Sequence, residues 1–312
     1  MDNATSAGSP RRSIEDAPVR VLSARPDLLT RLKNLINRRE LLASLITSDI
    51  RIKYKSSVLG IFWSMLAPAM TLGIYYLVFG LVLNNHIPNF FIYLFSGLVV
   101  WNLFQTAINT ATGVIVDRAS LVKKVSFPRE ILALANVGAS VVYFFIQLVV
   151  LALVLLIVGH APAWNYMWLL PFSFAALYLF TASVAMLTSA LNVYLRDIKH
   201  LMEVALMLWF YLTPIVYSYE NTISVKLHAH GIALIYFLNP ITLIVLTFQR
   251  VFYVATSVTS TAIGHPTLNI LPTWSVSHFF FLNLALLAIM IVLFLVSLTI
   301  FGRLEGNFES EL

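Results

Sequence analysis

The side chains able to perform acid–base or metal chemistry are few in this 312-residue chain, and they do not gather in one place. His228 and His230 form the one close histidine pair, and no Asp or Glu lies beside them in the sequence. A metal-dependent or acid–base enzyme needs several carboxylates or imidazoles at one site. The pair is therefore interpreted as solvated surface histidines in preference to a metal site, and no catalytic residue is assigned.

The sequence also lacks the residues that would let the chain power transport by itself. No GxxxxGK[ST] phosphate loop occurs, and the dipeptide Gly-Lys is absent, so ATP hydrolysis by that route is excluded. Ion-coupled transporters place ionisable residues inside their membrane spans. Residues 56–116 and 131–195 contain no Asp, Glu, Lys or Arg, which disfavours ion coupling. No cofactor is expected on this chain, and any energy should come from a partner protein.

Composition and charge placement indicate a membrane protein. Hydrophobic residues make up 59% of the chain and charged residues 11%, against roughly 25% charged residues in soluble domains. All Lys and Arg except Lys226 and Arg250 lie before residue 56, within 117–130, within 196–199 or at Arg303. Such clusters mark cytosolic segments, so the net charge of +6 is assigned to membrane orientation and not to nucleic-acid binding. The absence of Cys excludes disulfides and thiolate metal sites.

We predict an all-α polytopic membrane protein with six transmembrane helices. A span needs about 20 apolar residues, so each charge-free stretch has room for two spans. The predicted spans are residues 58–83, 90–113, 132–158, 168–191, 201–219 and 278–301. The basic segments between them place both termini in the cytosol. Residues 231–253 are predicted to form a re-entrant pair of half-helices, because Asn239-Pro240 interrupts an otherwise apolar segment.

Two segments precede the first span. Residues 1–33 are predicted to be a disordered cytosolic tail, since they are polar, contain prolines and lack the apolar core of a signal peptide. Residues 34–55 have the periodicity of an amphipathic helix and should lie in the cytosolic interface. Asp49 falls inside the apolar face of this helix, where an acid needs a partner. Lys53, four residues later, is one candidate, and a group on another element is the alternative.

Several motifs resemble those of type-2 ABC exporter permeases, in the same order along residues 40–310. They are Arg51–Trp63 followed by Pro68, Leu121–Leu132, Asn192–Ile198, Thr213–Tyr217, and Asn239-Pro240 with Arg250. They resemble, respectively, the entry to the first span, the first cytosolic loop, the turn after the fourth span, the outer end of the fifth span and the re-entrant segment. The branch is that of polysaccharide, O-antigen and teichoic-acid export, the Wzm-like permeases. Within it, the chain is similar to mycobacterial and actinobacterial members that export a lipid-linked galactan.

This resemblance implies a function and a set of partners. In the family, two permeases form a homodimer around one pore in the bacterial cytoplasmic (inner) membrane. Two copies of an ABC ATPase (Wzt-like), which hold ATP and Mg, dock beneath them. The chain would then be the permease subunit that moves a polyprenyl-pyrophosphate-linked polysaccharide outward. The alternatives are export of teichoic acid, a drug or a small lipid by the same class, a membrane-embedded glycolipid-processing enzyme, and an ion-coupled flippase.

The resemblance also implies roles for two basic segments. Residues 117–128 would be the coupling helix that sits in a cleft of the ATPase, and the alternative is a basic loop that only sets topology. The implied ATPase contacts are Leu121, Val122, Lys123, Lys124, Phe127 and Arg129. Residues 34–55 resemble the gate helix beside which a lipid-linked substrate enters. Its Arg51, Lys53 and Lys55 are expected to attract a pyrophosphate headgroup or, alternatively, anionic lipid in general.

Two further sets of residues complete the implied transport site. Six aromatic residues are predicted to line the pore, where sugar rings would pack on their faces, and ordinary helix packing is the alternative. They are Tyr75, Tyr76, Phe79, Trp209, Phe210 and Tyr211. Arg250 is a predicted contact for a phosphate or acid at the outer mouth, or else its side chain extends to the membrane interface.

Overall fold

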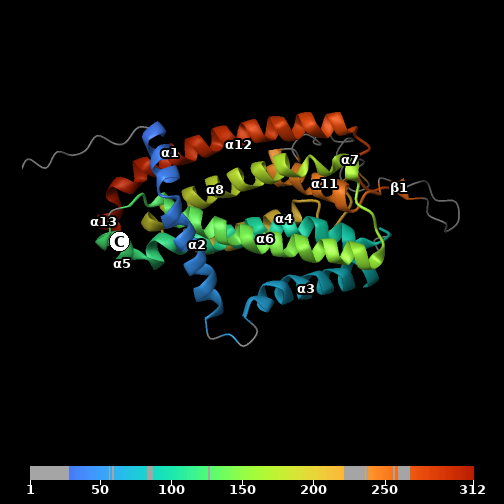
Figure 1. The fold of residues 1–312 in the computed structure, drawn as a ribbon, viewed down its shortest axis with the longest axis horizontal. Coiled ribbons are helices and arrows are strands. Elements are labelled where there is room, and N and C mark those ends of the chain that lie inside the picture. The colour runs from blue at the N-terminus through green and yellow to red at the C-terminus, as the bar shows by residue number, and fades with distance from the viewer. Residues whose placement is uncertain are drawn as a thin grey trace, which may run out of the picture.

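Four long helices run side by side and form the body of the molecule (Figure 1). The computed structural model describes residues 28–55, 57, 60–82, 87–125, 127–220, 236, 238–255, 257–258 and 268–312. The long helices are α4 (Phe90–Asp117), α6 (Glu130–Val158), α8 (Leu170–Tyr194) and α12 (Val276–Leu304). Of these, α4 is the most buried and packs against both α6 and α8, so it forms the centre of the bundle.

Shorter elements surround this bundle. The helices are α1 (Leu28–Asn37), α2 (Arg39–Tyr54), α3 (Trp63–Tyr75), α5 (Ala119–Lys124), α7 (Trp164–Met167), α9 (Ile198–Tyr211), α11 (Pro240–Phe252) and α13 (Phe308–Glu311). Helical turns of other types cover Gly60–Phe62, Tyr76–Val82 and Glu305–Asn307. Strands β1 (Ser257–Val258) and β2 (Leu268–Asn269) pair antiparallel, with Ser257 opposite Asn269.

The all-α membrane fold is confirmed. Within the described residues, five segments are long and apolar enough to cross a membrane. They are Met65–Val82, Phe90–Asp117, Glu130–Val158, Trp164–Tyr194 and Val276–Asn307. These correspond to five of the six predicted spans, and their boundaries lie within a few residues of the predicted ones in most cases.

The predicted span 201–219 has a different form. Helix α9 has 14 residues and ends at Tyr211, which at 1.5 Å per residue is about 21 Å and short for a crossing. It ends there because the ring of Pro214 disfavours helical backbone in the residue before it. The count of six spans is therefore not confirmed and stays a prediction.

The chain after α9 continues as buried turns. The carbonyl oxygen of Pro214 accepts a hydrogen bond from Gln249 Nε2 at 3.1 Å, and that of Tyr217 accepts one from the Tyr93 hydroxyl at 2.8 Å. Ser218 Oγ donates to the carbonyl oxygen of Ile270 at 2.7 Å. Irregular backbone is tolerated at membrane depth only where protein or water satisfies it. Side chains of α4 and α11 provide part of that satisfaction here.

Only the second half of the predicted re-entrant segment 231–253 can be compared, because residues 221–235 and 237 lie outside the described part of the chain. That half is α11, which is buried along nearly its whole length. Asn239 Oδ1 caps it by accepting the backbone N–H of Ile241 at 3.1 Å, and Pro240 occupies the first turn, where no N–H is needed. The same oxygen accepts the Trp209 indole N–H at 3.0 Å, so the Asn239-Pro240 motif also ties α11 to α9.

The amphipathic segment is two helices that cross the long bundle (Figure 1). They meet at Arg38, and α1 begins at Leu28, so residues 28–33, assigned to the tail by the sequence, are helical. Residues 1–27 lie outside the described residues. The helix crossings use glycines: a Cβ on Gly138 of α6 would lie 2.5 Å from Ile46 Cδ1 of α2, and a Cβ on Gly302 of α12 would overlap the Arg31 guanidinium of α1.

The two ends of the bundle carry different elements (Figure 1). Helices α5 and α13 and the C-terminus lie at one end, while α7 and β1 lie at the other. The basic segment 117–130 and the uncharged link 159–167 are therefore at opposite ends of the molecule, as their charge predicts.

Candidate transport site and coupling segment

The basic segment 117–130 contains the short helix α5, and three consecutive residues at its end face outward. Lys123, Lys124 and Val125 are exposed, with 50% of the Val125 surface accessible. Val125 was not among the residues expected to meet the ATPase. Its signal in the sequence is an apolar residue that directly follows two lysines.

The predicted apolar contacts in the segment are less available than expected. Val122 is only 2% exposed and packs inside the chain. Leu121 and Phe127 are half-buried against the core. The exposed residues of α5 and of the position directly after it are therefore Ser120, Lys123, Lys124 and Val125.

The first end of the segment is held by an ion pair to α2. Arg118, between α4 and α5, pairs through Nη2 with Oδ1 of Asp49. The two side chains are 25% and 11% exposed, so the pair is largely shielded from water. The partner of Asp49 is thus Arg118 on another element, and not Lys53 on the same helix. This settles the alternative that the sequence left open.

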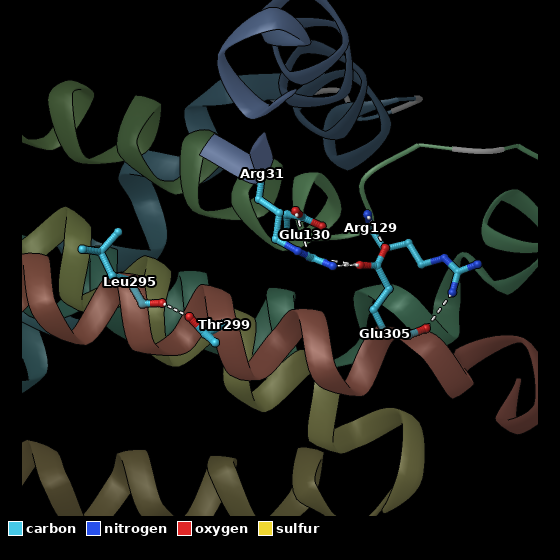
Figure 2. Close-up of polar contacts among 6 residues, drawn as sticks. All are labelled: Arg31, Arg129, Glu130, Leu295, Thr299 and Glu305. Carbon is cyan, nitrogen blue, oxygen red and sulfur yellow. Dashed lines mark hydrogen bonds and ion pairs between the residues drawn. The ribbon is translucent and has the colours of Figure 1, made fainter. Parts of the chain in front are cut away.

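A second ionic cluster holds the other end of the segment (Figure 2). Arg31 of α1 lies between Glu130, which begins α6, and Glu305, which follows α12. Arg31 Nη1 is 3.5 Å from Glu130 Oε1 and 3.1 Å from Glu305 Oε2. The backbone N–H of Arg129 donates to Glu305 Oε1 at 3.3 Å, and its Nη1 donates to the Glu305 carbonyl oxygen at 3.0 Å. Arg129, expected at the ATPase surface, therefore bonds within this chain.

The three cations of the predicted gate helix have different surroundings. Arg51 and Lys53 on α2, and Lys55 directly after it, are all exposed. Lys53 turns toward the bundle, and its Nζ lies 4.5 Å from the centre of the Tyr143 ring on α6. Desolvation by the surrounding protein lowers the pKa of Lys53 below its usual range. Lys53 thus contacts the membrane bundle through the Tyr143 ring of α6.

Aromatic residues predicted to line the pore come together from α3 and α9. Tyr75 stacks on Phe210, with ring centres 5.3 Å apart. Trp101 of α4 lies 5.5 Å from Phe210, and Phe104 lies 5.3 Å from Trp209. These two α4 residues were not predicted, because a single helix gives no sign of which of its aromatic residues will meet another helix.

Exposure divides these aromatic residues into two kinds. Phe210 is 5% exposed and serves as packing, whereas Tyr211 is 52% and Tyr76 37% exposed. Trp209 and Phe79 are half-buried. A small pocket of ≈ 110 Å³ opens between α3, α4 and α9, and Tyr75, Tyr211 and Gln105 are among its lining residues.

Arg250 lies near the end of α11, on the α7 side of the molecule. Its guanidinium carbon is 4.6 Å from the centre of the Tyr166 ring, and Nη1 donates to the Val254 carbonyl oxygen at 2.5 Å. A cation that bonds the carbonyls after a helix also complements the negative end of the helix dipole. Its contacts within the chain therefore hold the end of α11 against α7.

No group of three or more His, Asp or Glu residues among the described residues is close enough to hold a metal ion. His228 and His230, the pair noted in the sequence, lie outside those residues.

Together, the apolar helices and the basic segment at one end of the bundle define a polytopic membrane protein. The chain belongs to the ABC-2 type transporter family, whose model matches residues 40–253. It is 30% identical over 222 residues to an O-antigen export system permease protein of Myxococcus xanthus, covering 71% of this chain and 84% of that protein. It is also 32% identical over 179 residues to an O-antigen export system permease protein of Klebsiella pneumoniae, covering 57% and 69%. Family membership identifies the chain as the membrane subunit of a transporter rather than an enzyme.

Proposed function

We propose that this chain is the permease subunit of an ATP-driven exporter that moves a lipid-linked polysaccharide of O-antigen type out of the bacterial cytoplasm. The family match and the two O-antigen permeases support this function. A homodimer of the chain forms the pore in the cytoplasmic membrane, and two ABC ATPase subunits, which carry ATP and Mg, dock at the α5 end. A galactan cargo and a Wzt-like ATPase are the finer parts of the proposal.

The observation that carries the coupling role is the way in which segment 117–130 is held. Its middle presents Lys123, Lys124 and Val125 to the outside, while its two ends are tied by ion pairs to α2 and α1. Ion pairs shielded from water resist separation, because breaking one leaves an uncompensated charge. A displacement imposed on α5 by an ATPase is therefore passed to the N-terminal helices as well as to α4 and α6. A loop that only sets topology has no need of such attachments.

The exposed face of α5 provides the test. Lys123→Glu with Lys124→Glu reverses its charge, and Val125→Asp removes its apolar contact. Each is expected to abolish co-purification of the ATPase and to reduce glycan export at least tenfold. Lys33→Glu, an exposed charge reversal on α1, is the matched control and should leave co-purification unchanged. Undiminished co-purification and export in both α5 variants would refute the coupling assignment.

A further inference from the structure

A polar pocket of ≈ 110 Å³ lies between α3, α4 and α9, well inside the membrane-spanning bundle. It meets a second pocket of ≈ 380 Å³, which shares its lining residues Thr71 and Asn102. Both residues lie near the middle of their apolar windows, Met65–Val82 and Phe90–Asp117. The two pockets therefore form one space, the mid-span groove, which reaches the middle of the membrane.

Uncharged residues line almost all of the mid-span groove. Of the described residues that line the two pockets, only Lys53 is charged, and it does not line the smaller pocket. The α3 and α4 walls come from residues 56–116, which contain no Asp, Glu, Lys or Arg. Polar side chains inside a membrane span are costly, and those that face a cavity mark functional sites. The amide and hydroxyl groups of the groove are therefore candidate ligand contacts.

Gln105 presents hydrogen-bond donors to the groove. Its Oε1 accepts the Trp101 indole N–H at 3.0 Å. An indole can only donate, so the Gln105 atom in this contact is the oxygen. The NH₂ group of the same amide has no partner within the described part of the chain, and it is left to bond a ligand in the pocket that Gln105 lines.

Acceptors face the same groove. Thr71 Oγ1 donates its hydrogen to the Ala67 carbonyl oxygen at 3.1 Å, so its lone pairs remain. Asn102 and Gln147 share a hydrogen bond of 2.9 Å between α4 and α6, which leaves a carbonyl oxygen on Asn102 and an NH₂ group on Gln147. Tyr211 adds a hydroxyl, which can donate or accept. The groove therefore offers donors and acceptors together.

This mixture of donors and acceptors suits sugar hydroxyl groups and not phosphate. A hydroxyl both donates and accepts, so it can pair with either kind of group. An ionised phosphate only accepts, so the oxygens of Thr71 and Asn102 repel it, and a buried charge without a counter-charge is costly. The rings of Tyr75, Trp101 and Tyr211 add apolar surface on which the C–H face of a sugar can pack.

We propose that the mid-span groove is a contact site for uncharged sugar units, and that it selects a neutral polysaccharide over a polymer with phosphate in every repeat. Gln105, Asn102 and Gln147 bond the hydroxyl groups of the sugar. This inference rests on the proposed function and narrows its cargo, because it argues against teichoic acid, an alternative that the sequence leaves open. The pyrophosphate of a lipid-linked glycan is one group at one end, whereas phosphate repeats would place charge in the groove throughout transport.

Titration of the purified full-length chain in nanodiscs, which leave both membrane faces accessible, tests this selectivity. The probes are a tetrasaccharide of galactose and a tetramer of glycerol phosphate, and the wild type should bind the neutral probe at least tenfold more tightly. Gln105→Leu and Tyr211→Phe should each weaken that binding about fivefold, the size of one neutral hydrogen bond. Tyr178→Phe, which removes a hydroxyl from α8 outside both pockets, is the matched control and should change it less than twofold.

Gln105→Lys gives a readout that a role in helix packing alone would not move. The lysine puts a cation into the groove, so binding of the glycerol phosphate tetramer should rise at least tenfold while binding of the galactose tetrasaccharide falls. Thermal unfolding shows whether this variant is folded. If it is not, Tyr211→Phe, which loses a single oxygen atom, decides the test.

The proposal is overturned if the wild type binds the glycerol phosphate tetramer as tightly as the neutral probe, or if it does not bind the neutral probe. Unchanged binding in both Gln105→Leu and Tyr211→Phe also overturns it. The α5 variants judge the proposed export function separately. Loss of export in those variants, with unchanged sugar binding in the groove variants, would uphold the proposed function and reject the groove as a sugar site.

Discussion

Asp49 and Arg118 join α2 to segment 117–130 by an ion pair, and under the proposed function this contact passes motion of the segment to α2. Breaking the pair with Asp49→Arg or Arg118→Asp should lower the free energy of unfolding by about 2 kcal/mol, the usual size for a hydrogen bond to a charged group. Either variant should also uncouple ATP hydrolysis from export. Combining the two restores opposite charges and should recover a large part of both losses. Thermal unfolding in detergent and ATPase stimulation by the reconstituted complex measure these effects.

The matched control for this pair is His200→Gln. His200 lies 3.7 Å from Glu203 in an exposed pair at the same end of the molecule, and exposed pairs contribute little. If the doubly reversed protein were no better than either single variant, the contact would not transmit motion.

At the scale of elements, α2 can cross closely over α6 because Gly138 has no side chain. A leucine there has no room beside Ile46, so Gly138→Leu should displace α2 and lower the free energy of unfolding by about 1–3 kcal/mol, as overpacking does. Ile46→Ala in the same protein makes room and should recover a large part of the loss. Thermal unfolding and export measure the effect.

Gly73 is the matched control for this crossing. It also lies within a helix, α3, but no atom outside its own helix neighbourhood lies within 4 Å of the position of its Cβ. Gly73→Leu should therefore be tolerated, and equal damage in both variants would contradict the close crossing at Gly138.

The sequence predicts the long helices well, because a membrane span requires a run of apolar residues, and such a run can be recognised without knowing any tertiary contact. It predicts α9 less well, since a 14-residue helix followed by buried turns is as apolar as a full span. The sequence does not predict the full extent of α1, because this helix is stabilised by packing of Leu28, Leu32 and Leu35 against the core of the bundle. The signal was their spacing of four and three residues.

The candidate site, like the fold, could be predicted only in part from the sequence. Charge placement identifies segment 117–130, and the apolar position of Asp49 shows that it needs a partner. The identity of that partner is a tertiary fact, because Arg118 is 69 residues away. The pockets lined by Lys53, Asn102 and Gln147 could not be found from the sequence, because their lining residues come from α2, α3, α4 and α6, although Asp49 and Lys53 had been singled out individually.

At the scale of the whole molecule, the orientation of the bundle can be read with single cysteines, because the chain contains none of its own. Ser120 and Glu311 are exposed at the α5 end, and Asn165 is exposed in α7 at the other end. If the basic segment faces the cytosol, Asn165→Cys should react with a membrane-impermeant maleimide in cells whose outer envelope layer is permeabilised but whose cytoplasmic membrane is intact. Ser120→Cys and Glu311→Cys should react only after the inner membrane is permeabilised. Export by each variant is the control for folding.

Labelling of Glu311→Cys in intact cells, with Ser120→Cys protected, would mean that an odd number of membrane crossings separates the two residues. The six-span arrangement with a cytosolic C-terminus would then be wrong.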